Sequence, residues 1–184
     1  MDSLHYKFGR NLISYNLFSF FREDISASYE HFFAKGYLGI KIPLIFGFGS
    51  GNGDLGVRQF NDGQYKNSFT SGLDINFYPM GQNKISFFTG PSFQIGVVDF
   101  YYTERVPYIY SNYYGYYNNY RTEQRTQKDD LFVAGLVNNG VLFQPLPNFN
   151  MSVNLGLGVR YIETSMSDNS EVYATFGYHL GYRF

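Results

Sequence analysis

The chain has 184 residues and a mass of 21.3 kDa, which suits a single domain. Hydrophobic residues make up 44% of the chain and its net charge is only −1, which excludes a disordered chain. The 14 basic residues are balanced by 15 acidic ones, which argues against a nucleic-acid binder. The absence of cysteine excludes a disulfide scaffold, thiol catalysis and a Cys-based zinc site. Aromatic residues reach 21%, all Tyr and Phe, beside 20 Gly, which predicts β-structure in contact with something other than water.

Apolar residues recur at every second position along most of the chain, and this is the period of a β-strand. The first and sixth segments alternate poorly, so we expect a β-bulge in each, near Asn11 and near residues 138–140. Eight strands are expected at about 4–17, 24–34, 37–48, 68–78, 84–100, 130–144, 149–162 and 171–184.

The second and third segments form a hairpin whose register can be predicted. Lys35 and Gly36 make a two-residue turn in which Gly supplies a positive φ. The expected cross-strand pairs satisfy both the alternation and the charges. These pairs are Tyr29 with Ile42, Phe33 with Leu38, Glu30 with Lys41, and Phe32 with Gly39.

The connections also alternate, since those at 35–36, 79–83 and 145–148 are short whereas those at about 49–67 and 101–129 are long. An even number of strands with short turns at one end and long loops at the other is typical of a transmembrane β-barrel. Strands of this length also cover the about 9–11 residues that a bilayer requires. We therefore expect an all-β, eight-stranded, antiparallel, up-and-down transmembrane β-barrel over 1–184, with long outer loops and both termini periplasmic.

A soluble lipocalin-like barrel that carries an apolar ligand has the same number of strands, but its apolar face points inward. The polar face of this chain uses Gly, Ser, Thr and Asn more than Lys and Glu, which suits a crowded closed interior. Aromatic residues gather near strand ends, as in the aromatic girdles of membrane barrels. These features favour the membrane barrel.

The C-terminal heptapeptide Tyr178-His-Leu-Gly-Tyr-Arg-Phe184 resembles the C-terminal signal of bacterial outer-membrane barrels, in which alternate aromatics such as Tyr182 precede a final aromatic. His179 stands where that signal usually has Gly. The whole chain is similar to the small outer-membrane protein A/X-like barrels. The resemblance implies location in the outer membrane of a Gram-negative bacterium, contact with outer-membrane lipid, and recognition by the barrel-assembly machinery during insertion.

Charged residues fall on the predicted inner face. One interpretation is an ion or proton path, and the favoured one is a network of ion pairs that fills a narrow barrel. We expect Glu30 to pair with Lys41, and Arg160 to meet Glu171 near the outer rim. The predicted inner charges are Glu30, Lys41, Asp74, Arg160, Glu171 and Arg183.

Some eight-stranded barrels are enzymes that act on outer-leaflet lipid and need a His beside a Ser near that leaflet. His5, His31 and His179 are all expected in the periplasmic half, so we expect no enzymatic activity. No metal-binding spacing is present and no cofactor is expected.

The long outer loop expected at about 101–129 is rich in tyrosine, with nine Tyr among residues 101–120. Tyr supplies large contact area at low entropy cost, which favours a docking surface for a protein or glycan. Packing over the barrel mouth is the other interpretation. The predicted binding residues are Tyr108, Tyr110, Tyr113, Tyr114, Tyr116, Tyr117, Tyr120 and Arg121.

From the sequence we therefore predict a non-enzymatic membrane anchor that binds through this loop, as an accessory subunit of a larger outer-membrane complex or as a receptor for a surface glycan. The alternatives are a barrel enzyme that modifies outer-leaflet lipid and a soluble lipocalin-like carrier.

Overall fold

The computed structural model describes residues 8–21, 24–48, 64–112, 115–163 and 169–184, and gives the backbone alone for residues 64–66, 100–122, 124–129 and 169. These residues form a closed barrel in which each strand is antiparallel to its neighbours and β1 pairs with both β2 and β8. The elements are β1 (Asn11–Asn16), α1 (Leu17–Phe20), β2 (Asp24–Phe33), η1 (Ala34–Gly36), β3 (Leu38–Gly47), β4 (Gln64–Phe77), β5 (Ile85–Asn112), β6 (Gly115–Leu146), β7 (Phe149–Glu163) and β8 (Asn169–Arg183).

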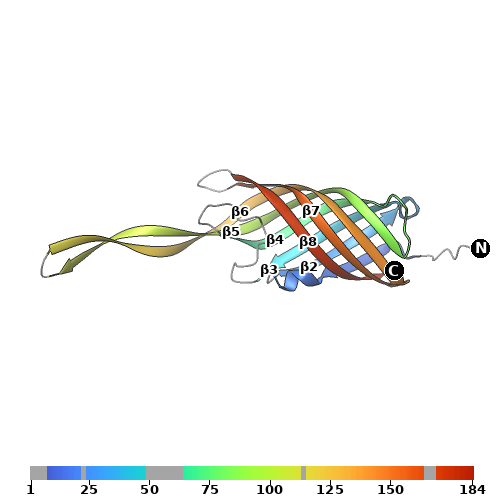
Figure 1. Cartoon of the computed structure of the whole chain (residues 1–184), viewed down its shortest axis with the longest axis horizontal. Helices are drawn as coiled ribbons and strands as arrows, with labels where there is room; N and C mark the ends of the chain where they lie inside the picture. Colours follow the sequence, from blue (N-terminus) through green and yellow to red (C-terminus); the bar gives the residue numbers. More distant parts are fainter. Residues whose placement is uncertain (1–7, 22–23, 49–63, 113–114, 164–168) are drawn as a thin grey trace, which may run out of the picture.

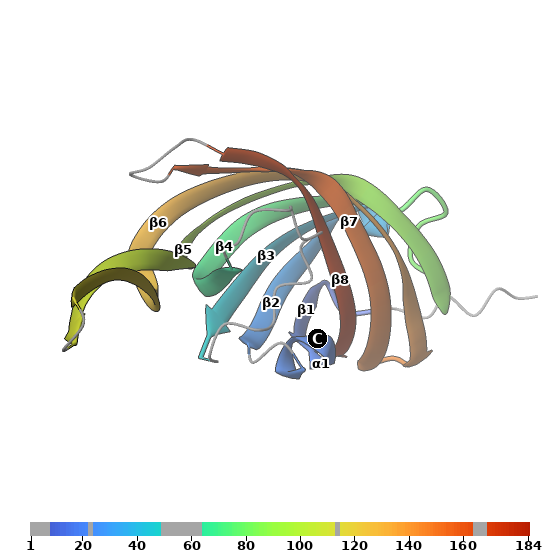
Figure 2. The same cartoon turned by 60° about the vertical axis from the view of Figure 1, so that its left-hand side comes forward.

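The barrel has two different ends (Figure 1). The C-terminus lies at one end, where the short connections β2–β3, β4–β5 and β6–β7 also lie. At the other end, β5 and β6 continue beyond the barrel as a paired two-stranded ribbon (Figure 2). The eight-stranded antiparallel barrel and its short turns are thus confirmed. No helix in the described ranges is long and apolar enough to cross a membrane.

The β2–β3 hairpin has the predicted register. Tyr29 pairs with Ile42, and Glu30 with Lys41, through to Phe33 with Leu38. The turn is closed by a hydrogen bond from the amide of Tyr37 to the carbonyl oxygen of Ala34. Both central residues have positive φ, 57° for Lys35 and 90° for Gly36, as a type I′ turn requires.

Side chains alternate between the two faces of the wall as the sequence predicts. Outward positions are apolar and exposed, for example Ile25, Phe46 and Leu155. Inward positions are mostly polar and buried, for example Ser28 and Asn138. This orientation is the opposite of a soluble carrier barrel, whose apolar face lines the interior.

The two predicted bulges are wrong. β1 pairs in continuous register from Asn11, and β6 pairs regularly with β5 and β7 through residues 138–140. The alternation of β6 is weak for another reason, since apolar side chains such as Phe132 and Leu136 are buried on its inner face. Register shifts occur instead at Asn67/Phe69, Val98/Phe100 and Phe143/Leu146.

Strands β1, β5 and β6 differ in extent from expectation. β1 begins at Asn11 rather than near residue 4, although residues 1–7 lie outside the described ranges. The segment 101–129, expected as a loop, is strand in all its described residues. Of the other expected long loop, residues 49–63 lie outside the described part of the chain.

Candidate functional site

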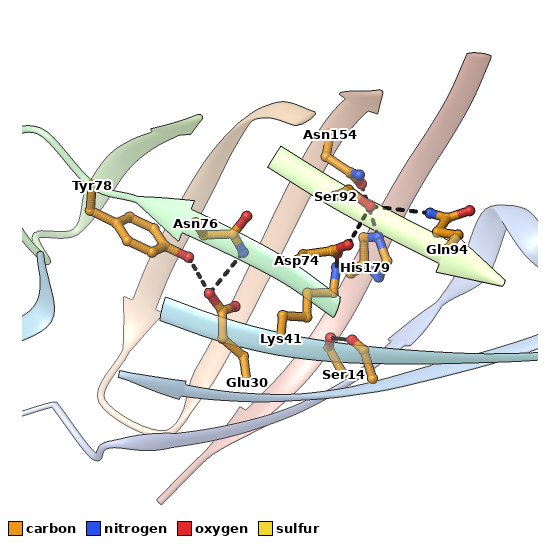
Figure 3. Close-up of polar contacts among 11 residues, drawn as sticks. Ser14, Glu30, Lys41, Asp74, Asn76, Tyr78, Ser92, Gln94, Asn154 and His179 are labelled. Carbon is orange, nitrogen blue, oxygen red and sulfur yellow. Dashed lines mark hydrogen bonds and ion pairs between the residues drawn. The ribbon is translucent and has the colours of Figure 1, made fainter. Parts of the chain in front are cut away.

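A polar layer occupies the middle of the barrel interior (Figure 3). Lys41 Nζ on β3 lies 4.0 Å from Asp74 Oδ2 on β4. Ser92 on β5 donates to Asp74 Oδ1 at 2.6 Å, and Gln94 donates to the Ser92 hydroxyl at 3.4 Å. These contacts tie three neighbouring strands together inside the wall.

The carboxylate of Glu30 lies nearer the end that carries the C-terminus. It accepts hydrogen bonds from Asn76 Nδ2 and from the hydroxyl of Tyr78, both at 2.9 Å (Figure 3). Glu30 and Lys41 are Cα partners as predicted, but the expected direct ion pair does not form. The ammonium group of Lys41 reaches Asp74 on the next strand instead, because register fixes Cα positions and leaves long side chains free to choose a partner.

Near the ribbon end, Arg160 on β7 and Glu171 on β8 form the predicted ion pair. Arg160 Nε donates to Glu171 Oε1 at 2.7 Å, and Nη2 contacts the same oxygen. The guanidinium carbon lies 4.6 Å from the ring centre of Tyr173 and 5.6 Å from that of Phe132. The charge is therefore neutralised and enclosed by aromatic side chains.

At the opposite end, Arg183 on β8 contacts three other segments of the chain. Its Nε donates to the carbonyl oxygen of Gly9 at 2.6 Å, and its Nη1 donates to Gln82 Oε1 at 2.8 Å. Its guanidinium carbon also lies 4.1 Å from the ring centre of Phe32. The contact links β8 with the residues before β1 and with the β4–β5 turn.

Two apolar clusters flank the polar layer, and neither was predicted from the sequence. Apolar residues at inward positions break the alternation of the strands that carry them, and this irregularity in the sequence could have indicated the clusters. The cluster near the ribbon comprises Val98, Phe132, Ala134, Leu136, Ile162 and Tyr173. The cluster near the C-terminus comprises Leu12, Phe32, Tyr78, Phe88 and Leu142. With side chains packed at both ends, the interior is arranged as a filled core rather than an open pore.

The histidines lie apart from one another. His179 faces inward, where its Nε2 lies 2.9 Å from Asn154 Oδ1. On β2, His31 Nδ1 lies 2.7 Å from Asn11 Oδ1 and its ring packs against Phe33. His5 lies outside the described residues. In the described ranges, neither histidine makes a hydrogen bond to a serine, and no group of three or more His, Asp and Glu could hold a metal ion.

Those predicted binding residues that the structure describes lie on the strands of the ribbon rather than in a loop. Tyr110 pairs with Tyr117, Tyr108 with Asn119, and Arg121 with Val106. Tyr116 and Tyr120 pair with Ser111 and Pro107, whereas Tyr113 and Tyr114 lie outside the described residues. Structurally, then, the tyrosine-rich segment is a β-hairpin projecting from the barrel (Figure 1).

The last aromatics, Tyr182 and Phe184, are exposed on the outer wall, and their rings stack with centroids 6.2 Å apart. The backbone of Phe184 exchanges two hydrogen bonds of 2.9 Å with Asn11, which closes the barrel.

Comparisons with models of protein families, with curated proteins and with solved structures find no match to this chain.

Proposed function

We propose that this chain is embedded in a bacterial outer membrane as a barrel and presents the ribbon to a binding partner. One observation carries the proposal: the outward side chains of the closed wall are mostly apolar and exposed, whereas most of the inward ones are polar and buried. Exposed apolar surface on this scale is unfavourable in water, and a bilayer covers it without cost to the backbone, because a closed barrel pairs its own hydrogen-bonding groups.

The orientation follows from the two ends. Membrane barrels carry short turns on the periplasmic side and long extensions outside. In this arrangement both termini are periplasmic and the β5–β6 ribbon is extracellular. Exposed aromatics at the C-terminal end, Tyr182 and Phe184, would then anchor the wall at the periplasmic interface and serve as the assembly signal.

The role we propose is non-enzymatic. The interior is filled by two apolar clusters and a polar layer between them, which favours an anchor over a pore. A lipid-modifying enzyme would need a His and a Ser in contact near the outer leaflet, whereas His31 and His179 lie on the halves of β2 and β8 nearer the C-terminal end.

Besides its tyrosines, the ribbon has backbone hydrogen-bonding groups along the two outer edges of β5 and β6. β4 pairs with β5 only as far as Tyr101, and β7 pairs with β6 only as far as Leu131, so no described strand covers the outer edges beyond these residues. Such edges accept an extended segment of another protein by strand addition.

The edge of β6 suits strand addition better than that of β5. Pro107 of β5 pairs with Tyr120 of β6 in uninterrupted register. Because proline has no backbone N–H, this is possible only at a position whose nitrogen points away from β6. The edge of β5 therefore lacks a donor at Pro107. By the same alternation, every second residue of β6, including Asn118 and Thr122, directs its N–H and C=O to the free edge. We propose that a partner protein adds an extended segment there.

The test is the mass and composition of the protein extracted in mild detergent from its native membrane. Deletion of residues 104–123 should release a larger assembly into its components. Asn118→Pro should do the same, because it removes an outward N–H while sparing the ladder with β5, and Asn118→Ala is the matched control that keeps the assembly. A wild-type chain found without another protein, or an assembly in which another protein still accompanies the chain after both changes, would overturn binding through the ribbon.

A further inference from the structure

Two polar side chains interrupt the exposed apolar wall on neighbouring strands. Thr89 on β5 and Asn139 on β6 are Cα partners, and both face outward. The Thr89 hydroxyl donates to Asn139 Oδ1 at 2.8 Å. The outward neighbours of Asn139 along β6 are Val137 and Val141, so the amide is surrounded by apolar surface.

Asn139 lies in the middle of the wall rather than at a rim. The part of β6 that is paired with β7 runs from Leu131 to Leu146, and Asn139 stands eight residues from the first and seven from the second. At about 3.3 Å per residue along a tilted strand, this position is near the centre of an apolar band that is roughly 25 Å tall.

The amide of Asn139 keeps an unused donor. Its Oδ1 is bonded to Thr89, whereas its Nδ2 has no hydrogen-bond partner among the residues that the structure describes. An unpaired polar group in hydrocarbon is costly, so a lipid chain is an unfavourable neighbour for this side chain. A protein surface that brings an acceptor is a favourable one.

A groove opens beside this polar pair. It has a volume of about 440 Å³ and follows the outer wall from the β4–β5 turn across β5, β6 and β7. Asn139 lines it together with the apolar residues Phe87, Val141, Val153 and Leu155. A donor without a partner and a concave apolar surface thus lie side by side, which is the arrangement of an interface core.

We infer that this surface binds a second copy of the same chain, side by side in the membrane. A carboxamide is both donor and acceptor and can pair with its own copy across a two-fold axis. Two barrels with the same orientation can be related only by an axis along the membrane normal, which puts every residue at the same depth as its copy. Any other partner would need an acceptor at that same depth. The inference rests on the proposed insertion in a membrane, and a dimer would display two ribbons together.

The test uses the absence of cysteine from the chain. Val141→Cys places one thiol in the groove and leaves Asn139 intact. In native membranes, a short bifunctional thiol reagent should give a product at twice the 21.3 kDa chain mass. Leu44→Cys, on the outward face of β3, is the control that should give none.

Adding Asn139→Leu to Val141→Cys should reduce the product by about tenfold. This change makes the wall more apolar, so the barrel still folds. Ser71→Val, which removes an outward hydroxyl from β4, is the matched control and should leave the product unchanged.

No product with Val141→Cys in a membrane-inserted barrel would overturn the dimer while leaving the proposed insertion intact. Equal cross-linking at Leu44→Cys would also overturn it, as random collision, and so would a product of another mass, which identifies a different partner. A chain absent from the membrane fraction would overturn the proposed function and the dimer together.

Discussion

The ion pair between Arg160 and Glu171 offers the sharpest stability prediction. Only 4% of the Arg160 side chain and 13% of the Glu171 side chain are exposed. Glu171 Oε1 accepts hydrogen bonds from both Nε and Nη2 of Arg160. Glu171→Gln keeps the size of the side chain but removes its charge, so the buried guanidinium loses the counter-charge of Glu171.

The size of the expected loss in unfolding free energy follows from the burial of the ion pair. Breaking a buried pair by removing one partner costs about 3–5 kcal/mol. Arg160 keeps the ring of Tyr173 at 4.6 Å, which offsets part of the loss. We therefore expect the free energy of unfolding to fall by about 3 kcal/mol, a change of roughly a hundredfold in the folding equilibrium.

The assay is urea unfolding of the barrel in lipid vesicles, followed by the far-ultraviolet circular dichroism of its β-structure. The double variant Arg160→Met/Glu171→Leu removes both charges of the pair and should lose less stability than Glu171→Gln, because it leaves neither charge of the pair without the other. If Glu171→Gln lies within about 0.5 kcal/mol of the wild type, or if the double variant is less stable than the single one, the ion pair does not stabilise the barrel as expected.

Three further predictions concern the interior and the wall. The reconstituted barrel should show no steady conductance in planar bilayers, and Lys41→Ala should not open one, because the apolar clusters above and below remain; steady current would contradict the filled interior. Ile42→Arg, on the outward face, should reduce folding stability in vesicles by about 2–4 kcal/mol, measured by the same urea titration, and an unchanged midpoint would place that face away from lipid. Gly140→Ala should cost about 1–3 kcal/mol in that assay, because the added methyl group overlaps the ring of Phe88 and the backbone oxygen of Val153. A neutral result would mean that both the ring and the neighbouring strand can move aside.

Much of the barrel could be predicted because two local signals agree. In the β2–β3 hairpin, the turn at Lys35 and Gly36 sets the register, and the alternation of Tyr29 and Phe33 with polar residues sets the face. A slip by one residue would exchange the two faces, so only one register satisfies the pattern.

The misplaced bulges and the missed ribbon have different causes. In β6, apolar residues such as Phe132 and Leu142 pack inside the barrel, which erases the contrast between the two faces without disturbing the backbone. The ribbon at 101–129 projects beyond the barrel, so neither of its faces is selected to be apolar and no period of two appears in the sequence.

The interior contacts could be predicted only in part. The sequence places Glu30, Lys41 and Asp74 on the inner face, and the structure agrees. Which side chains meet depends on the reach of each one across the barrel, and hydrogen bonds from Asn76 and Tyr78 satisfy Glu30 in place of the lysine. Arg160 and Glu171 are Cα partners on adjacent strands, and there the register was enough.

Fluorescence quenching can show whether the apolar wall of the barrel faces lipid. Single cysteines introduced at Ile42 and Leu155 on the wall, and at Thr122 on the ribbon, carry an environment-sensitive dye in a chain that has no other thiol. If the wall faces lipid, a quencher attached to lipid chains in the vesicle will quench the dyes at residues 42 and 155, and aqueous iodide will quench only the dye at residue 122. Efficient iodide quenching at both wall positions would show instead that the wall faces water.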